Sequence, residues 1–290
     1  MSATLLIEQL LNGCQLGVML FLMAAGLTLV FGIMNLINLA HGSLFMIGAF
    51  LAASITSATG QLGLAIVLAV LATAAIGALL EWSLLRHYYK RSHLDQCLVT
   101  FGLILVFNEA TRIIWGATPL RIPLPAFLAG SVEILPGIQY PAVRLAILIV
   151  GLTVAALLYL LIVHTRGGAW VRAGASDRVM AAALGINVSR VFLIVFAVGA
   201  GLAGLAGIMA APILAVQIGM GEPILILALV VIVIGGVGSI RGAFIAALLI
   251  GIGDTFGRVL LPAALGSMAI YALMAALLAW RPRGLFPAHV

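Results

Sequence analysis

Three polar side chains within an apolar stretch are the residues of this chain best suited to chemistry. Asn35, Asn38 and His41 recur at every third position in residues 32–42. Amide and imidazole groups both donate and accept hydrogen bonds, so this set could contact a small, net-neutral solute. The same groups could instead bond within the protein, and for His41 that structural role stays open.

Glycines interrupt a second apolar stretch, at residues 235–243. Backbone groups released by such an interruption are tolerated at membrane depth only where they line a cavity or are buried in protein. Paired interruptions are a sequence pointer to a transport pathway. Arg241 could line that pathway or anchor a helix end at the membrane surface. The predicted pathway residues are Asn35, Asn38, His41, Gly42, Gly236, Gly238 and Ser239.

Acidic residues in the apolar segments each have a basic neighbour close in sequence. The pairs are Glu109 with Arg112 and Asp254 with Arg258, while Glu81 lies about one turn from Arg86 at the boundary of its span. Spacings of three and four residues let two side chains meet on one helix face. We therefore predict neutralised pairs rather than a proton relay, which would need an unpaired carboxylate at mid-depth.

Neither an HExxH helix nor a GxSxG turn occurs, so we expect no catalytic residue and no enzymatic activity. The two cysteines, Cys14 and Cys97, lack metal-type spacing. They are predicted to be small buried apolar residues, with no disulfide, metal site or cofactor.

Composition places the chain in lipid. Of its 290 residues, 64% are hydrophobic and 8% are charged, whereas a soluble domain has about 25% charged residues. The net charge of +6 lies in short loops and not in a stripe that could follow phosphates. Membrane lipid is therefore an expected partner and nucleic acid is not.

Apolar segments of about 20 residues predict membrane-spanning helices. We place them at 9–31, 42–58, 62–85, 97–116, 144–163, 191–211, 223–236, 242–260 and 264–280. Two of them, 42–58 and 223–236, are short and could be half-helices, which would leave eight full crossings. Gly201, Gly204 and Gly207 predict close contact of the sixth span with a neighbouring helix.

The predicted fold class is all-α: one polytopic transmembrane helical bundle over 1–290, with about eight or nine spans and two broken helices. Similar patterns follow the two breaks, Gly42 to Ala49 and Gly242 to Gly251. This similarity suggests an internal repeat, which we expect to be inverted.

Basic residues concentrate in three places and predict orientation, because Lys and Arg are retained in cytoplasmic loops. With nine spans, all three places lie on the cytoplasmic side with the C-terminus, and the uncharged start, 1–7, is periplasmic. The proline-rich loop at about 117–143 is then periplasmic. It is either a passive connection or a surface where a solute-delivering protein docks. The basic residues are Arg86, Lys90, Arg91, Arg166, Arg172, Arg178, Arg190, Arg281 and Arg283.

The cytoplasmic loop at about 164–190, which we call the connector, contains a predicted short helix from Ser176 to Leu184. Ser176 or Asp177 can cap its first turn, and Gly185 can end it. Such a helix could lie at the membrane surface and insert into a groove of another protein. It could equally be an ordinary connection. The only lysine, Lys90, follows no glycine-rich phosphate loop, so any ATP chemistry must come from a partner.

The connector resembles the coupling helix in permease subunits of branched-chain amino acid (Liv-type) importers of the ATP-binding-cassette class, and both glycine breaks match the same family. The resemblance implies a pore-forming permease of the bacterial inner membrane, for branched-chain amino acids or a related small solute. It also implies a homologous second permease, two cytoplasmic ATPases and a periplasmic solute-binding protein. The residues implied to couple to the ATPase are Arg172, Ala173, Asp177, Ala181, Leu184, Gly185 and Ile186.

A carrier driven by an ion gradient is the alternative function. It would explain the broken helices equally well. It gives no reason for the connector, and it predicts an essential carboxylate within the membrane.

Overall fold

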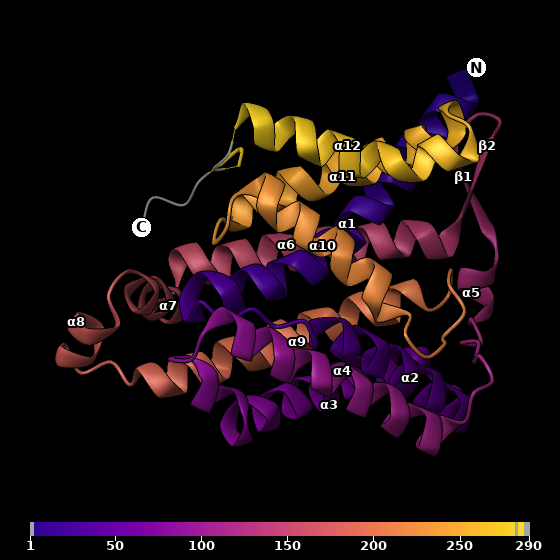
Figure 1. Ribbon diagram of the computed structural model, residues 1–290. Helices are drawn as coiled ribbons and strands as arrows, with labels where there is room; N and C mark the ends of the chain where they lie inside the picture. The colour runs from indigo at the N-terminus through magenta and orange to yellow at the C-terminus, as the bar shows by residue number, and fades with distance from the viewer. Residues whose placement is uncertain (1–2, 282–283, 287–290) are drawn as a thin grey trace.

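The chain folds into a bundle of long helices in the computed structural model, which describes residues 3–281 and 284–286 (Figure 1). Arg283, used above to assign orientation, lies outside the described residues, as do Met1 and Ser2 of the predicted periplasmic start. Each of the nine predicted spans corresponds to one long helix. These are α1 Ala3–Met34, α2 His41–Thr59, α3 Leu62–Ser83, α4 His93–Trp115, α6 Ala142–His164, α9 Val188–Ala210, α10 Gly221–Gly235, α11 Ile240–Leu260 and α12 Ala263–Trp280.

The predicted polytopic helical bundle is confirmed. In the described part of the chain, seven helices are long and apolar enough to cross a membrane by length and composition. Of the two short predicted spans, α2 belongs to these seven, whereas α10 is a shorter apolar helix. The α12 helix has 18 residues. The largest boundary error is at the start of α1, which begins at Ala3 rather than at residue 9.

Smaller elements occupy the loops between the long helices. The connector contains two helices and not one, because a helix that the sequence analysis missed precedes the predicted one. The loop at 117–143 contains a short helix and an antiparallel hairpin. The elements are η1 Leu85–Tyr88, α5 Ala126–Ala129, β1 Ser131–Leu135, β2 Ile138–Pro141, α7 Arg166–Ser176 and α8 Arg178–Ala183.

The α1 and α9 helices form the centre of the bundle. In an 18-residue window, 83% of α1 and 78% of α9 is buried, against 17% of α4. The α9 helix packs on α1, α2 and α3, and α1 packs most extensively on α11. The outer faces of the peripheral helices are therefore free for lipid.

Small residues bring α9 close to its neighbours. A Cβ atom on Gly204 would lie 2.9 Å from the Thr73 side chain of α3, and one on Gly207 would overlap the backbone of Phe45 in α2. The predicted close contact is thus confirmed at these two glycines. At Gly201 the nearest atom, on Ala74, would be 3.5 Å away, which is ordinary contact.

Cys14 and Cys97 are unpaired, and both are partly exposed. The sequence analysis thus predicted more burial than the structure shows, because each cysteine lies on a helix face that other helices only partly cover.

The two ends of the bundle carry different elements (Figure 1). The connector helices α7 and α8 lie at the end of the bundle where α12 finishes. The start of α1 and the β1–β2 hairpin lie at the opposite end. This arrangement places the basic connector and the proline-rich loop on opposite sides, as the sequence analysis predicts. The inverted repeat stays a prediction.

Candidate functional site

The connector folds as two helices joined at Asp177. The Asp177 carboxylate accepts hydrogen bonds from the backbone N–H groups of Val179 and Met180, at 2.8 and 2.9 Å. It therefore caps α8. Asp177 was one of the two capping residues predicted, the other being Ser176. Gly185 follows α8 with a φ of 85°, a left-handed conformation that glycine adopts without strain. Both predicted boundary signals are confirmed.

The outer face of α8 is apolar. Val179, Met180 and Leu184 are 81%, 58% and 75% exposed, and they lie in the connector between two spans, not within a span. Ala181 is 2% exposed and points into the protein, so within this chain it is not available to a partner. Four of the predicted coupling residues are exposed: Arg172, Asp177, Leu184 and Gly185. Ala173 is half-buried, and Ile186 packs partly against the core. Val179 and Met180 were not among the predicted coupling residues.

Arg178 joins the connector to the end of α1. Its guanidinium donates a hydrogen bond to the Ile33 carbonyl oxygen at 3.0 Å and lies 5.0 Å from the centre of the Phe192 ring. The last carbonyls of a helix have no partner within it and carry partial negative charge. A cation at this position therefore stabilises the end of α1, immediately before the first break. Arg172 in α7 similarly donates to the Ile162 carbonyl of α6.

A buried carboxylate lies next to this contact. Glu81 is 1% exposed; it accepts a hydrogen bond from the Tyr89 hydroxyl at 2.6 Å and pairs with Arg86 at 3.6 Å. Tyr89 packs edge-on against Phe192. Burial, and then the hydrogen bond to Glu81, raise the pKa of Tyr89 well above its ordinary value. The phenol therefore remains a hydrogen-bond donor at neutral pH.

Removing this hydroxyl is expected to destabilise the connector end of the bundle. The change Tyr89→Phe leaves the buried Glu81 carboxylate with only its longer ion pair, at a cost of about 1–3 kcal/mol. We expect a lower melting temperature in detergent. The matched control is Tyr88→Phe, because no hydrogen bond of the Tyr88 hydroxyl is found among the described residues. Equal melting temperatures for the two variants would contradict the proposed role of the hydroxyl.

The two predicted ion pairs are confirmed. Glu109 and Arg112 lie 3.2 Å apart on an exposed face of α4. Asp254 and Arg258 lie 2.8 Å apart, with the Asp254 side chain buried. Each carboxylate in these two pairs therefore has a guanidinium beside it.

The first break begins at Asn35, directly after α1. Asn35 has a φ of 52°, a left-handed conformation that asparagine adopts more readily than most residues. The following chain is held by Gln96 of α4, whose side-chain oxygen accepts a hydrogen bond from the Ile37 backbone N–H at 3.1 Å. Gln96 also donates to the Tyr88 carbonyl at 3.2 Å. This anchoring residue was missed by the sequence analysis, because its partners are distant in sequence.

Asn38 and His41 are enclosed within the bundle. Their side chains are 1% and 0% exposed, and none of their polar side-chain atoms has a hydrogen-bond partner of normal geometry. The His41 ring lies where α1 and α9 approach each other, so that a Cβ atom on Gly26 would be 2.9 Å from Nε2. Buried polar groups normally find partners. These two residues are therefore unusual, and the structure brings them together inside the protein and not on an open surface.

Gly42 lies where the first turns of α2 and α10 meet. A Cβ atom on Gly42 would be 2.8 Å from the Gly221 carbonyl oxygen. The two helices that start inside the bundle therefore touch at their N-terminal ends, which only glycine allows at this separation.

The second break is a tight glycine turn. Gly236 and Gly238 have φ values of 95° and 81°. Ser239 caps α11, because its side-chain oxygen accepts a hydrogen bond from the Gly242 backbone N–H at 3.1 Å. The predicted pathway role of Ser239 thus coincides with a capping role in the fold.

The C-terminal segment covers the end of α10, which the sequence analysis did not foresee. The backbone N–H groups of Leu285 and Phe286 donate to the carbonyls of Ile234 and Gly235, at 2.7 and 3.2 Å. These bonds satisfy the last carbonyls of α10.

A cavity of about 610 Å³ joins both breaks to the connector. The second break touches the last turn of α1, because a Cβ atom on Gly32 would be 2.7 Å from the Gly238 Cα atom. Of the predicted pathway residues, Asn35 and Gly238 line the cavity, whereas Asn38, His41, Gly42, Gly236 and Ser239 lie outside its lining. The connector contributes Val171, Arg172, Ala175, Ser176 and Arg178.

The proline-rich loop at 117–143, at the opposite end of the bundle from the connector, is anchored to α1. The Tyr140 hydroxyl donates to the Asn12 side-chain oxygen at 3.1 Å, and Arg144 donates to the same oxygen. Burial raises the pKa of Tyr140, so its hydroxyl remains a donor at neutral pH. The hairpin is therefore an ordered structure, and both predicted roles of this loop stay open.

Within the described residues, no group of three or more His, Cys, Asp or Glu side chains is arranged to hold a metal ion.

Comparison with known proteins gives one consistent result. The family described as "Branched-chain amino acid transport system / permease component" matches residues 9–278. The chain is 28% identical to the high-affinity branched-chain amino acid transport system permease protein BraD of Pseudomonas aeruginosa, over 96% of this chain and 95% of that protein.

Two further relatives agree. The high-affinity branched-chain amino acid transport system permease protein LivH of Escherichia coli is 28% identical over 96% of this chain and 94% of its own length. A probable branched-chain amino acid transport permease protein LivH of Methanocaldococcus jannaschii is 27% identical over 86% of this chain and 80% of its own. No solved structure matches the chain.

Proposed function

The chain belongs to the family of permease components of branched-chain amino acid transport systems, and from that premise we propose that it forms half of the translocation pore of a bacterial ATP-binding-cassette importer. It is a multi-pass membrane protein and a transport component, not an enzyme. Its proposed cargo is a branched-chain amino acid or a related small solute. Its proposed partners are a homologous second permease, two cytoplasmic ATPases and a periplasmic solute-binding protein.

The cavity of about 610 Å³ carries this proposal, because it joins the connector to both helix breaks. A force applied to α8 would reach the end of α1 through the hydrogen bond from Arg178 to the Ile33 carbonyl. The exposed apolar face of α8 supports docking of a separate protein at the same end. The coupling residues that the family resemblance implies keep that proposed role, with Ala181 acting from inside the fold.

We propose that the connector end of the bundle faces the cytoplasm. The basic residues Arg86, Lys90, Arg166 and Arg178 lie in the segments on this side, as retention of positive charge in cytoplasmic loops requires. The C-terminus is then cytoplasmic and the N-terminus periplasmic. In a bacterium this membrane is the inner membrane.

The proposed pathway follows the two breaks. Asn35 and Gly238 line the cavity directly. Asn38 and His41 are buried, with no hydrogen-bond partner of normal geometry for their polar side-chain atoms, and we propose that they contact solute in a conformation in which α2 and α10 separate at Gly42. The remaining pathway residues, Gly236 and Ser239, form the turn that allows the second break to move.

The proposal predicts that uptake into proteoliposomes requires the ATPase subunits. The sharpest single change is Leu184→Glu, which places a charge on the exposed apolar face of α8. We expect roughly tenfold weaker binding of the ATPase, because loss of a central apolar contact at an interface costs more than about 1 kcal/mol. Binding is measured with the purified permease and ATPase, and uptake with labelled leucine.

The matched control is Val132→Glu, the same kind of change at an exposed site in β1, at the opposite end of the bundle. This variant is expected to bind the ATPase normally. Uptake that proceeds without ATPase and follows a proton or sodium gradient would instead establish the alternative, a secondary carrier.

A further inference from the structure

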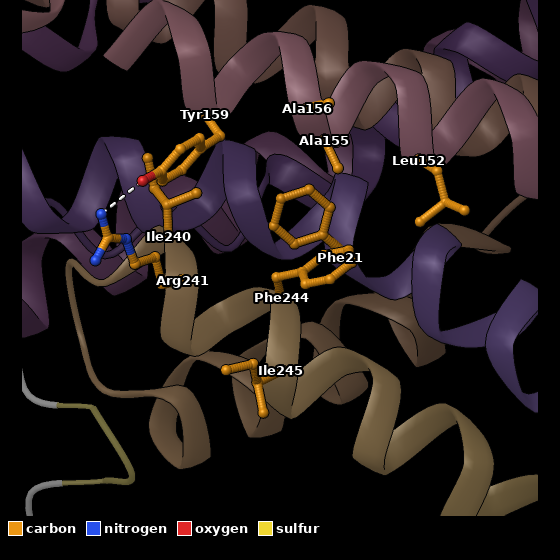
Figure 2. Close-up of a pocket in the computed structure, with 9 residues that line it drawn as sticks. All are labelled: Phe21, Leu152, Ala155, Ala156, Tyr159, Ile240, Arg241, Phe244 and Ile245. Atoms are coloured by element: carbon orange, nitrogen blue, oxygen red, sulfur yellow. Dashed lines mark hydrogen bonds between the residues drawn. The ribbon is translucent and has the colours of Figure 1, made fainter. Parts of the chain in front are cut away.

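A groove of about 410 Å³ runs between α6 and α11, with α1 as its floor (Figure 2). Both α6 and α11 pack on α1. The groove is lined by apolar side chains over most of its length. These are Phe21 from α1, Leu152, Ala155 and Ala156 from α6, and Phe244 and Ile245 from α11.

One end of the groove carries a positive charge. The Arg241 guanidinium donates a hydrogen bond to the Tyr159 hydroxyl at 2.6 Å and lies 5.2 Å from the centre of the Tyr159 ring. Among the described residues, Arg241 takes part in no ion pair, whereas three other arginines do. A guanidinium has five N–H donors, and Arg241 is exposed. It can therefore bind an anion while it remains in contact with Tyr159.

The charged end lies on the same side as the connector. Tyr159 is near the end of α6 that leads into α7, and Arg241 is in the first turn of α11, directly after the second break. Leu152 lies at the opposite end of the groove (Figure 2), seven residues from Tyr159 and thus about 10 Å away along the helix. The groove therefore runs along the direction of the spans, with its cation at the connector end.

We propose that this groove binds an anionic phospholipid of the cytoplasmic leaflet, with one acyl chain against Phe21 and Phe244 and the phosphate on Arg241. An acyl chain and the groove share the same direction across the membrane. Anionic lipids are concentrated in the cytoplasmic leaflet, and basic pockets between spans on that side suit their headgroups. The assignment to that leaflet depends on the orientation proposed above.

Charge complementarity favours lipid over the transported solute. An amino acid carries an ammonium group as well as a carboxylate, and the groove offers donors but no carboxylate to pair with an ammonium. The flanking helices are also open to lipid, since only 22% of the α6 window and 33% of the α11 window are buried.

The inference is tested with the full-length protein in nanodiscs that contain phosphatidylglycerol and phosphatidylcholine, followed by native mass spectrometry of the lipids retained. We expect Arg241→Gln to lower retained phosphatidylglycerol about fivefold, because the phosphate bound in the groove loses its charged hydrogen-bond donor. Phosphatidylcholine should be unchanged. Filling the groove by Ala156→Trp should lower retention of both lipids.

Each variant has a matched control. Arg166→Gln removes a charge at an exposed site on the same end, outside the groove, and Leu157→Trp adds a ring at an exposed site on α6, also outside the groove. Both should retain phosphatidylglycerol as the wild type does, with unchanged elution and melting.

Retention of phosphatidylglycerol by Arg241→Gln and Ala156→Trp at wild-type levels would overturn the inference. So would loss of solute uptake or of subunit association in these variants without loss of lipid, because the groove would then belong to the pathway or to an interface. ATP-driven uptake by the wild-type protein is measured separately and does not depend on lipid retention by the variants. Failure of the lipid site can therefore be distinguished from failure of the proposed function.

Discussion

Arg178→Gln is expected to uncouple ATP hydrolysis from uptake. The change removes the hydrogen bond to the Ile33 carbonyl and the contact with the Phe192 ring. A hydrogen bond from a charged group contributes about 1.5–3 kcal/mol, and a cation over an aromatic ring about 0.5–2 kcal/mol. The connector would then move without carrying the end of α1 with it. We expect the amount of solute transported per ATP hydrolysed to fall more than tenfold.

Arg178 is proposed as a positioning residue, because it acts through the end of α1. Three measurements separate that role from general destabilisation of the fold. Binding of the ATPase and its basal hydrolysis should persist in Arg178→Gln, because the outer face of α8 is unchanged. Arg178→Lys should restore part of the coupling, since an ammonium can still bond to the carbonyl. Arg190→Gln removes an exposed arginine of the same end and should behave as wild type. Tight coupling in Arg178→Gln would contradict the role assigned to the Ile33 contact.

The long helices could be predicted from the sequence because lipid imposes a simple requirement. A span needs about 20 apolar residues, with its backbone groups satisfied internally. This rule placed α3 at 62–85 against Leu62–Ser83 in the structure. It also placed α12 at 264–280 against Ala263–Trp280. Such agreement depends on composition alone and needs no knowledge of which helices pack together.

The helix α7 could not be predicted in the same way. Its sequence contains Gly167, Gly168 and Gly174, and each internal glycine costs a helix about 1 kcal/mol relative to alanine. Tertiary packing outweighs that cost at Gly168, where a Cβ atom would overlap the carbonyls of Leu161 and Ile162. A glycine-rich stretch next to predicted cytoplasmic arginines is therefore predicted as a loop, because the sequence does not show which residues pack against it in the fold.

Contacts between residues far apart in the sequence could not be predicted either. Arg178 and Ile33 are separated by 145 residues, and no spacing rule connects them. The burial of His41 depends on α1 and α9, which come from different parts of the chain. One local signal was available, because an asparagine after an apolar run can adopt the left-handed conformation that ends a helix, as Asn35 does.

Gly207→Val is expected to prevent stable folding. A Cβ atom at this position would overlap the Phe45 carbonyl, which belongs to the backbone of α2 and cannot rotate away. The α9 helix packs on α1, α2 and α3, so its displacement disturbs the centre of the bundle. Overpacking of this kind costs about 3 kcal/mol or more. We expect little monodisperse protein on size-exclusion chromatography, and a smaller loss for Gly207→Ala.

The matched control is the same substitution at Gly102 in α4, where no atom lies within 4 Å of the added Cβ position. Because valine has a higher helix propensity than glycine, Gly102→Val should be as stable as wild type or slightly more stable. Similar yields for the two valine variants would mean that α2 and α9 can separate without loss of the fold.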